Sequence, residues 1–229
     1  MAFDPRYAPA YTPRQAARYL RVPVATVRAW AVGQPYGQGR KGFFKAVIEP
    51  QQGDSGLAFS FVNLVELHVL AALRRVHGLP LHKVRASIEY LAKQYPRVKH
   101  PLADLDLLTD GLDIWLKELE AVVAVSDQGQ LGIRAAVESH LRRVERGPHG
   151  AAIRLFPFTR PAEAADEPRA IVIDPQFAFG HPILARAGVP TRAIVQRFDD
   201  GDTVEQLATD YELPREEIEE AIRWERLAA

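Results

Sequence analysis

The sequence predicts a mainly α-helical protein with small β elements: an N-terminal winged helix-turn-helix, a middle α+β block, and a C-terminal three-helix domain that is again like a helix-turn-helix. Three observations predict this fold class. Apolar residues recur at helical spacing in several segments, the same helix-capping pattern occurs near both ends, and the two halves carry opposite charges. A length of 229 residues, 47% of them hydrophobic, is enough for one or two cores.

Composition excludes several classes of protein and of site. No stretch approaches the roughly eighteen apolar residues of a membrane span, and the N-terminus lacks the apolar region of a secretory signal, so we expect a cytoplasmic protein without membrane contact. The absence of cysteine excludes disulfides, thiolate metal sites and a cysteine nucleophile. The chain has no Gly-x-Ser-x-Gly motif and no phosphate-binding loop, and its 7 histidines are scattered. We therefore expect neither an enzyme nor a cofactor or metal site.

The net charge of zero hides a strong asymmetry along the chain. Up to Lys99 there are 15 basic and 5 acidic residues, and after it 14 basic and 24 acidic residues, so the halves carry +10 and −10. Such a split predicts two surfaces with different partners. Arginine outnumbers lysine by 23 to 6, which suits bidentate contacts to phosphate or carboxylate, although a genome rich in G and C gives the same bias.

The basic half begins with a predicted helix-turn-helix. Thr12 is placed to cap a helix, Pro13 suits its first position and Gln15 completes a capping box, which predicts a helix over residues 13–20. After a break at Pro23, a second short helix is predicted up to Trp30, and the apolar spacing lets the two helices pack at a steep angle.

A wing is predicted after the second helix. A glycine-rich loop over residues 33–42, a strand over 43–48, a turn at 51–56 and a second strand over 57–60 are typical of one. Two apolar helices are then predicted, over residues 61–76 and 81–95.

The polar face of this helix-turn-helix carries arginines and has no acid between residues 12 and 30, which favours DNA binding. Arg18 is interpreted as part of a solvated helix face. The candidates for phosphate contacts are Arg14, Arg21, Arg40, Lys41 and Lys45. The candidates for base edges are Arg28 and Thr26, because arginine bonds guanine in the major groove and threonine can touch a thymine methyl.

The segment TPRQAARYLRVPVATVRAW resembles the opening of MerR-type and excisionase-type winged helix-turn-helix domains, and the predicted wing and helices after it agree with that resemblance. The Gly-Leu-Pro junction at residues 78–80 resembles the stop between later helices of the MerR fold. The resemblance implies operator DNA as a partner. A palindromic operator would require a homo-oligomer, which we expect to be a dimer.

The middle of the chain is predicted as a small α+β block over residues 100–160. Strands are predicted at 104–108 and 113–116 around a turn at Asp110-Gly111, then a strand at 121–125, a turn at 127–130, a helix over 133–144 and an apolar run at 151–158. Its aspartates are interpreted as an exposed strand face rather than a magnesium site. Residues 161–170 are predicted to be a linker. The predicted domains are thus residues 1–99, the block, the linker, and an acidic C-terminal domain over residues 171–229.

The C-terminal domain repeats the first helix-turn-helix with its charge reversed. At a constant offset of 191 residues, Thr12 aligns with Thr203 and Pro23 with Pro214, and the apolar positions match as well. In the second copy Glu205, Glu212 and Glu219 replace Arg14, Arg21 and Arg28, so this segment sums to −6 where the first sums to +4. An acidic helix-turn-helix is repelled by phosphate, which favours a protein partner.

The residues of this domain look like a small domain family once classed only as of unknown function, with the pattern Asp-Pro, Gly-x-Pro, Thr-Arg and an acidic last helix. Here the pattern is found at Asp174-Pro175, Gly180-His181-Pro182 and Thr191-Arg192, but the family's next glycine is displaced to Gly188. The family is similar to antitoxins of type II toxin–antitoxin pairs, and a MerR-like domain joined to it resembles one VapB-type group. The resemblance implies a PIN-domain ribonuclease of the VapC class as partner, and repression of the antitoxin's own operon.

Two routes of toxin inhibition follow from that resemblance. Arg223 and Arg226, beside Trp224, could pair with metal-binding carboxylates of the nuclease, or the acidic face with Glu205, Glu212 and Glu219 could cover its RNA groove. Core packing of Trp224 is an equal alternative for that residue. A different class of function, a MerR-like regulator that responds to a small molecule, stays open, and a ligand-dependent change in DNA affinity would favour it.

Overall fold

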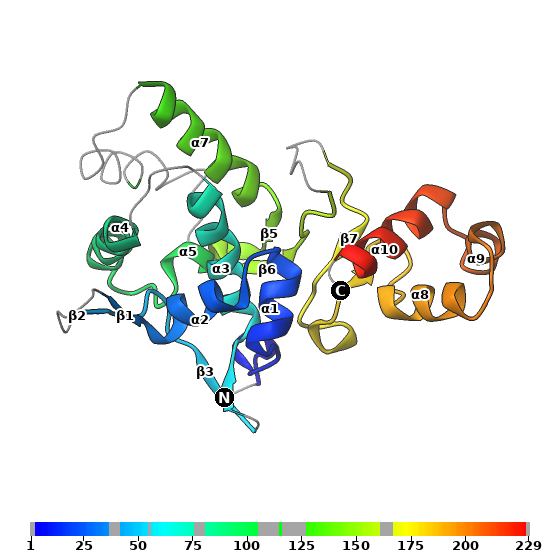
Figure 1. Cartoon of the computed structure of the whole chain (residues 1–229), viewed down its shortest axis with the longest axis horizontal. Helices are drawn as coiled ribbons and strands as arrows, with labels where there is room; N and C mark the ends of the chain where they lie inside the picture. Colours follow the sequence, from blue (N-terminus) through cyan, green and yellow to red (C-terminus); the bar gives the residue numbers. More distant parts are fainter. Residues whose placement is uncertain are drawn as a thin grey trace. The chain divides into compact units, whose positions relative to one another are not determined.

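The computed structural model describes residues 3–36, 42–54, 56–75, 81–104, 115, 127–160 and 167–227. Within these ranges the protein is mainly helical, with small antiparallel strand pairs (Figure 1). Residues 1–152 form one compact unit and residues 153–229 a second. Among the described residues no helix is both long enough and apolar enough to cross a bilayer.

The first unit is built around the helix α3 (Phe61–Arg75), which is buried at every position from residue 61 to 72. It contacts α1, α5, α7 and η1, so nearly its whole surface is covered by other elements. The other elements of this unit, in chain order, are η1 (Pro5–Tyr7), α1 (Pro13–Leu20), α2 (Val24–Val32), β1 (Gln34–Tyr36), β2 (Gly42–Phe44), β3 (Gln51–Gly53), β4 (Gly56–Ala58), α4 (Leu81–Gln94), α5 (Pro101–Asp104), α7 (Asp127–Leu141), β5 (Val144–Arg146) and η3 (Pro148–Gly150).

The predicted helix-turn-helix is present as α1 and α2, which pack against each other. The capping box is confirmed: the Gln15 amide donates to Thr12 Oγ1 at 3.2 Å, and the Thr12 amide donates to Gln15 Oε1 at 2.9 Å. Arg21 ends α1 in the left-handed region, with φ 55°. The capping box thus fixes the start of α1, and the left-handed Arg21 fixes the turn between the helices.

The wing differs from the prediction. Instead of one hairpin across residues 51–56 there are two: β1 pairs with β2, with Gln34 opposite Phe44, and the expected turn is itself the hairpin β3–β4. The amides of residues 47 and 48 donate to the carbonyl of Trp30 at 2.7 and 3.2 Å, so the chain leaves the strand geometry after Phe44. Gly33 makes the first hairpin possible, because its φ is +77° and a Cβ there would overlap the Phe44 carbonyl oxygen.

The predicted turn at residues 127–130 is wrong, because α7 already begins at Asp127, and it ends at Leu141 rather than at residue 144. Each of the two glycines in α7 costs the helix only about 1 kcal/mol, and the packing of α7 on α3 outweighs this cost. The predicted strands at 104–108, 113–116 and 121–125 lie almost entirely outside the described residues. At their edges Asp104 and Trp115 are helical, so the strand prediction is wrong there. The His100 carbonyl accepts the Asp104 amide at 2.8 Å, and Trp115 Nε1 donates to Ser87 Oγ at 3.0 Å.

The second unit combines short strands with three helices. Ile171 lies opposite Leu184 in an antiparallel pair, Leu155 bridges to Ile173, and the three helices contact one another pairwise. Its start, after residue 152, comes earlier than the predicted linker at residues 161–170. Its elements are β7 (Ile171–Val172), η4 (Ala178–Gly180), β8 (Ile183–Leu184), α8 (Thr191–Asp199), α9 (Val204–Asp210) and α10 (Arg215–Leu227), and β6 (Ala152–Leu155) begins at the boundary between the units.

The second capping box gives a direct test of this local chemistry. The Gln206 amide donates to Thr203 Oγ1 at 3.2 Å, and the Thr203 amide donates to Gln206 Oε1 at 2.7 Å. We expect Thr203→Ala to lower the free energy of unfolding of the second unit by about 1 kcal/mol, measured by urea unfolding followed by circular dichroism.

Thr209→Ala is the matched control, because this hydroxyl lies inside α9 and bonds only the preceding turn, at the Glu205 carbonyl. Its change in unfolding free energy should stay within about 0.5 kcal/mol. Equal losses in the two variants would show that the cap does not determine the stability of α9.

Candidate DNA-binding and partner-binding surfaces

The basic face of the first helix-turn-helix is open to solvent. Arg14 on α1 and Arg28 on α2 are exposed, while Arg21 and Thr26 are half-buried. Among the described residues, no ion pair engages Arg14, Arg21 or Arg28. These guanidinium groups therefore need not break an internal ion pair before they contact phosphate or bases.

The basic loop of the predicted wing is described only in part. Lys45, directly after β2, is exposed, and its carbonyl accepts a bond from the Arg85 side chain on α4. Arg40 and Lys41 lie outside the described residues.

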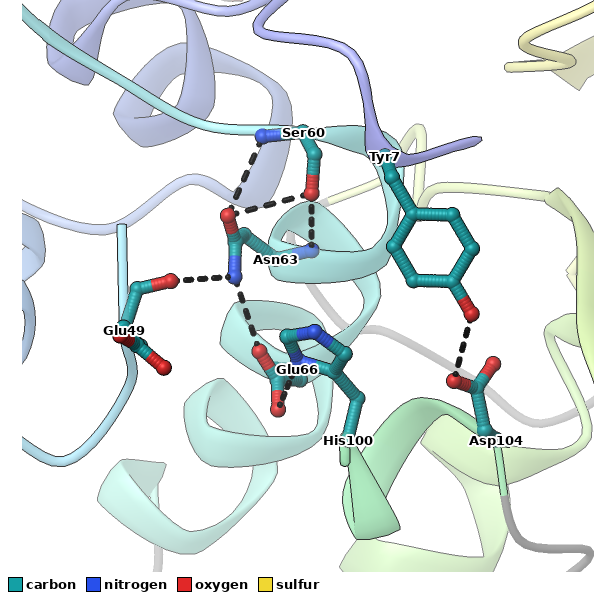
Figure 2. Close-up of polar contacts among 7 residues, drawn as sticks. All are labelled: Tyr7, Glu49, Ser60, Asn63, Glu66, His100 and Asp104. Carbon is teal, nitrogen blue, oxygen red and sulfur yellow. Dashed lines mark hydrogen bonds and ion pairs between the residues drawn. The ribbon is translucent and has the colours of Figure 1, made fainter. Parts of the chain in front are cut away.

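A buried polar network lies beneath this domain and joins the base of the β3–β4 hairpin to α3, as Figure 2 shows. Ser60 and Asn63 form a capping box at the start of α3. The backbone N–H of Asn63 donates to Ser60 Oγ, and the backbone N–H of Ser60 donates to Asn63 Oδ1, both at 3.2 Å. The side chain of Asn63 donates from Nδ2 to the Glu49 carbonyl and to Glu66 Oε2, both at 3.0 Å. One amide thus connects the segment before β3 to an acid on α3.

The same network contains a buried ion pair. His100 Nδ1 lies 3.2 Å from Glu66 Oε1, and the two side chains are only 3% and 8% exposed. Burial lowers the pKa of His100, but the hydrogen bond and the charge of Glu66 outweigh it, so the pKa is raised above its ordinary value. Beside it, Tyr7 donates to Asp104 Oδ2 at 3.1 Å, and burial together with this carboxylate raises the pKa of Tyr7 (Figure 2).

The sequence patterns described above do not predict this network. Ser60-x-x-Asn63 directly before an apolar helix is a capping signal that could have been found, whereas the pairing of Glu66 with His100 joins residues far apart in the chain. Within the described part of the chain, no three His, Asp or Glu side chains are placed to hold a metal ion. The network connects the segment before β3 to α3 and to His100.

The second helix-turn-helix repeats the backbone of the first. Glu212 has φ 55°, the same value as Arg21 at the matching position, and both first helices begin with a Thr-Gln capping box. Pro214 precedes α10 as Pro23 precedes α2. The repeat found in the sequence is therefore a repeat of local structure.

The acidic face of this copy is partly neutralised by its own arginine. Arg215 lies 2.5 Å from Glu205 and 2.8 Å from Glu219, and its hydrogen bond with Glu219 raises its pKa. Glu212 is exposed and takes part in no ion pair among the described residues. Of the three predicted glutamates, Glu205 and Glu219 therefore share Arg215 as a partner, and Glu212 does not.

Arg223, Trp224 and Arg226, the residues predicted to contact a toxin near the end of α10, have different surroundings in the structure. Arg223 pairs with Glu220, and Arg226 lies 3.0 Å from Asp199. Trp224 is only 2% exposed and belongs to the core of the second unit, so it offers no surface to a partner. Of the two predictions for Trp224, the structure therefore supports core packing of the last helix rather than an anchor for a partner.

The motif residues of the C-terminal pattern have structural roles. Asp174 Oδ1 accepts the Gln176 amide at 2.8 Å, and the Pro182 carbonyl accepts the Thr191 amide at 3.1 Å. Thr191 Oγ1 also donates to Glu225 on α10 at 2.6 Å, which ties the start of α8 to the last helix. The displaced Gly188 closes a turn onto Leu184, with φ +68°, so it supplies the left-handed residue that this turn requires.

Comparisons with known proteins agree with this division into two parts. A family described as “Putative DNA-binding HTH domain” matches residues 9–88, and “Protein of unknown function (DUF433)” matches residues 171–224. The chain is 28% identical over 233 residues to “Putative antitoxin VapB45” of Mycobacterium tuberculosis, covering 93% of this chain and 92% of that protein. It is 27% identical over 221 residues to “Uncharacterized protein Rv2308” of the same organism, covering 93% and 88%. The crystal structure of Rv2018, also from Mycobacterium tuberculosis, matches with a TM-score of 0.67 at 25% identity, covering 97% of this chain and 100% of that one.

The ion pair between His100 and Glu66 predicts a pH dependence of stability. A histidine whose pKa is raised in the folded state stabilises fully below its unfolded pKa of about 6.5, and this contribution is lost as the pH rises through the folded pKa. We expect the unfolding free energy of the first unit to fall over this range, and Glu66→Gln to flatten the fall, as measured by urea unfolding at a series of pH values.

Glu89→Gln is the control, since Glu89 is exposed on α4 and contacts neither residue of the pair. If Glu66→Gln and Glu89→Gln gave the same pH profile as the unmodified chain, the pair would not be the source of the dependence.

Proposed function

We propose that this protein is the antitoxin of a type II toxin–antitoxin pair, which binds and neutralises a VapC-like PIN-domain ribonuclease and represses its own operon. The observation that carries this proposal is the identity to “Putative antitoxin VapB45”, which extends over 93% of the chain and so includes both units in the same order. The charges of the units support it, because residues 1–152 contain 20 basic and 14 acidic residues, and residues 153–229 contain 9 and 15. Both activities belong to the cytoplasm.

The N-terminal unit binds operator DNA as a MerR-like winged helix-turn-helix. In this arrangement α2 enters the major groove, where Arg28 and Thr26 reach base edges. The hydrogen bonds from the Asn63 side chain to the Glu49 carbonyl and to Glu66 tie the segment before β3 to α3 and so position the wing. A homodimer places two such units on two half-sites. The phosphate contacts are made by Arg14, Arg21, Arg40, Lys41 and Lys45.

The C-terminal unit binds the toxin through the face formed by α9 and α10, with Glu205, Glu212 and Glu219. Arg223 and Arg226, near the end of α10, belong to the alternative route, inhibition by an inserted arginine, whereas Trp224 is buried in the core of the unit. Most of these charges are paired internally, but exposed ion pairs are worth only about 0–1 kcal/mol, so a partner's charges can replace them at little cost.

The DNA-binding proposal predicts different effects for two arginines. Arg28→Ala should relax sequence preference, costing about 1–3 kcal/mol on the preferred operator and less on other sequences. Arg14→Ala should weaken binding to all sequences alike and make the salt dependence shallower by about one unit of slope. Fluorescence anisotropy with operator and scrambled duplexes at several salt concentrations measures both effects. Identical behaviour of the two variants would reject the assigned roles.

The toxin-binding proposal predicts that reversing the acidic face separates the two activities. In the variant Glu205→Arg, Glu212→Arg, Glu219→Arg, ribonuclease inhibition should fall more than about 100-fold, because like charges face each other at the interface, while operator binding persists. The double variant Arg223→Ala, Arg226→Ala tests the alternative route, insertion of arginine into the nuclease site.

Glu89→Arg, on the exposed side of α4 in the first unit, is the control for charge alone. The readout is cleavage of a labelled RNA by a VapC-like PIN-domain ribonuclease. Undiminished inhibition by both sets of variants would contradict a toxin-binding role for this face.

A further inference from the structure

The connection between β7 and β8 presents two phenylalanines to solvent. Phe177 is 53% exposed and Phe179 is 92% exposed. Ala178 between them points the other way and packs on a buried cluster that includes Val172 and Ile183. The loop is thus anchored by its middle residue and displays an aromatic ring on either side.

The backbone of this loop adopts an unfavourable conformation. Three successive residues have positive φ: 46° at Ala178, 54° at Phe179 and 75° at Gly180. Only glycine adopts this region readily, and a bulky residue there is a genuine outlier. Burial does not account for Phe179, because its side chain stays in solvent. Strain of this kind persists where the surrounding structure imposes it, and it is concentrated at functional sites.

The surrounding structure does hold the loop. The Phe177 amide donates to the Asp174 carbonyl at 3.1 Å, and the Gly180 amide donates to the Phe177 carbonyl at 2.8 Å. Asp174 in turn pairs with Arg154 at 2.8 Å. A loop ordered in this way loses little conformational freedom when a partner covers it, so burial of its rings contributes to affinity with a small entropic penalty.

The charge around the loop indicates what kind of partner fits. Residues 175–185 contain no Asp, Glu, Lys or Arg, whereas the unit as a whole has 15 acidic and 9 basic residues. An uncharged segment with exposed aromatic rings has the composition of the centre of a protein–protein interface. Nucleic acid would be repelled by the net negative charge of the unit, and a second copy would bring together two units of net negative charge. A different protein, with an apolar pocket and a basic rim, is the complementary occupant.

We propose that Phe177 and Phe179 form a hydrophobic anchor that enters an apolar pocket of a basic-rimmed protein partner, and that this partner is the ribonuclease of the proposed function. The inference rests on that proposed function and adds the residues that supply binding energy, whereas the acidic residues of α9 and α10 steer the encounter. The anchor lies within residues 171–224, the part matched by the domain of unknown function.

The variant Phe179→Asn tests the anchor. Asparagine tolerates the left-handed region, so the loop keeps its fold and the ring alone is removed. Calorimetric titration with a VapC-like PIN-domain ribonuclease should show an affinity loss of about 30-fold or more, the size expected of an interface hot spot. The melting temperature should stay the same or rise, because strain at residue 179 is relieved. Phe3→Ala is the matched control: Phe3 is 81% exposed but lies in the first unit, and its variant should bind like the unmodified chain.

The outcomes separate the two proposals. If the unmodified chain does not bind the ribonuclease, the proposed function fails. If it binds and Phe179→Asn binds equally well, the anchor is overturned while the proposed function stands. Sedimentation of the chain alone provides the remaining test: loss of self-association in Phe179→Asn, with ribonuclease binding unchanged, would identify a second copy as the occupant and would also overturn the inference. If Phe179→Asn lowers both the affinity and the melting temperature, Phe179→Tyr decides between loss of the ring and loss of the fold. Because this variant keeps an aromatic ring, it should bind like the unmodified chain if the ring makes the contact, and weak binding would overturn the anchor.

Discussion

The burial of α3 at every position from residue 61 to 72 is the constraint on which the first unit depends. A helix covered on all sides supplies apolar contacts to every neighbour, but its polar groups and the ends of its backbone must then find partners inside the protein. Ser60 and Asn63 satisfy the start of the helix, and Glu66, one turn later, is accommodated because His100 neutralises it. The same bonds reach the segment before β3, so the base of the wing is fixed by what the core helix requires.

The charged side chains of the two helix-turn-helix segments differ in how far they form internal ion pairs. Arg14, Arg21 and Arg28 take part in no ion pair among the described residues, whereas several acids of α9 and α10 pair with arginines of the same unit: Glu205 and Glu219 with Arg215, and Glu220 with Arg223. Arg197 shows the pattern most clearly, since it lies 2.6 Å from both Asp202 and Asp210 and joins α8 to the start and the end of α9. The basic surface is thus available to any polyanion, while the acidic surface needs a partner whose charges compete with internal pairs. Such a difference favours selectivity on the acidic side.

Local chemistry could be predicted from the sequence, and long-range pairing could not. The start of α1 and α9 follows from Thr12 and Thr203 with the glutamines three residues later, and both capping boxes are confirmed. The prediction of the wing was wrong in detail because residues 47 and 48, expected in a strand, donate their amides to the carbonyl of Trp30, a partner that strand patterns do not reveal. The candidate surfaces show the same limit. Spacing predicted the helices that carry Arg14, Arg28, Glu205 and Glu219, but only the packing of α10 shows that its tryptophan is internal.

The equal backbone angles of Arg21 and Glu212 have an evolutionary consequence. The turn between the two helices closes on a left-handed residue in both copies, yet one copy places a cation there and the other an anion, so the geometry is indifferent to the sign of the side chain. A module with this backbone can change its class of partner through substitutions at solvent-facing positions alone, with no change of its interior. Folding and recognition are then free to diverge at separate rates within a single chain.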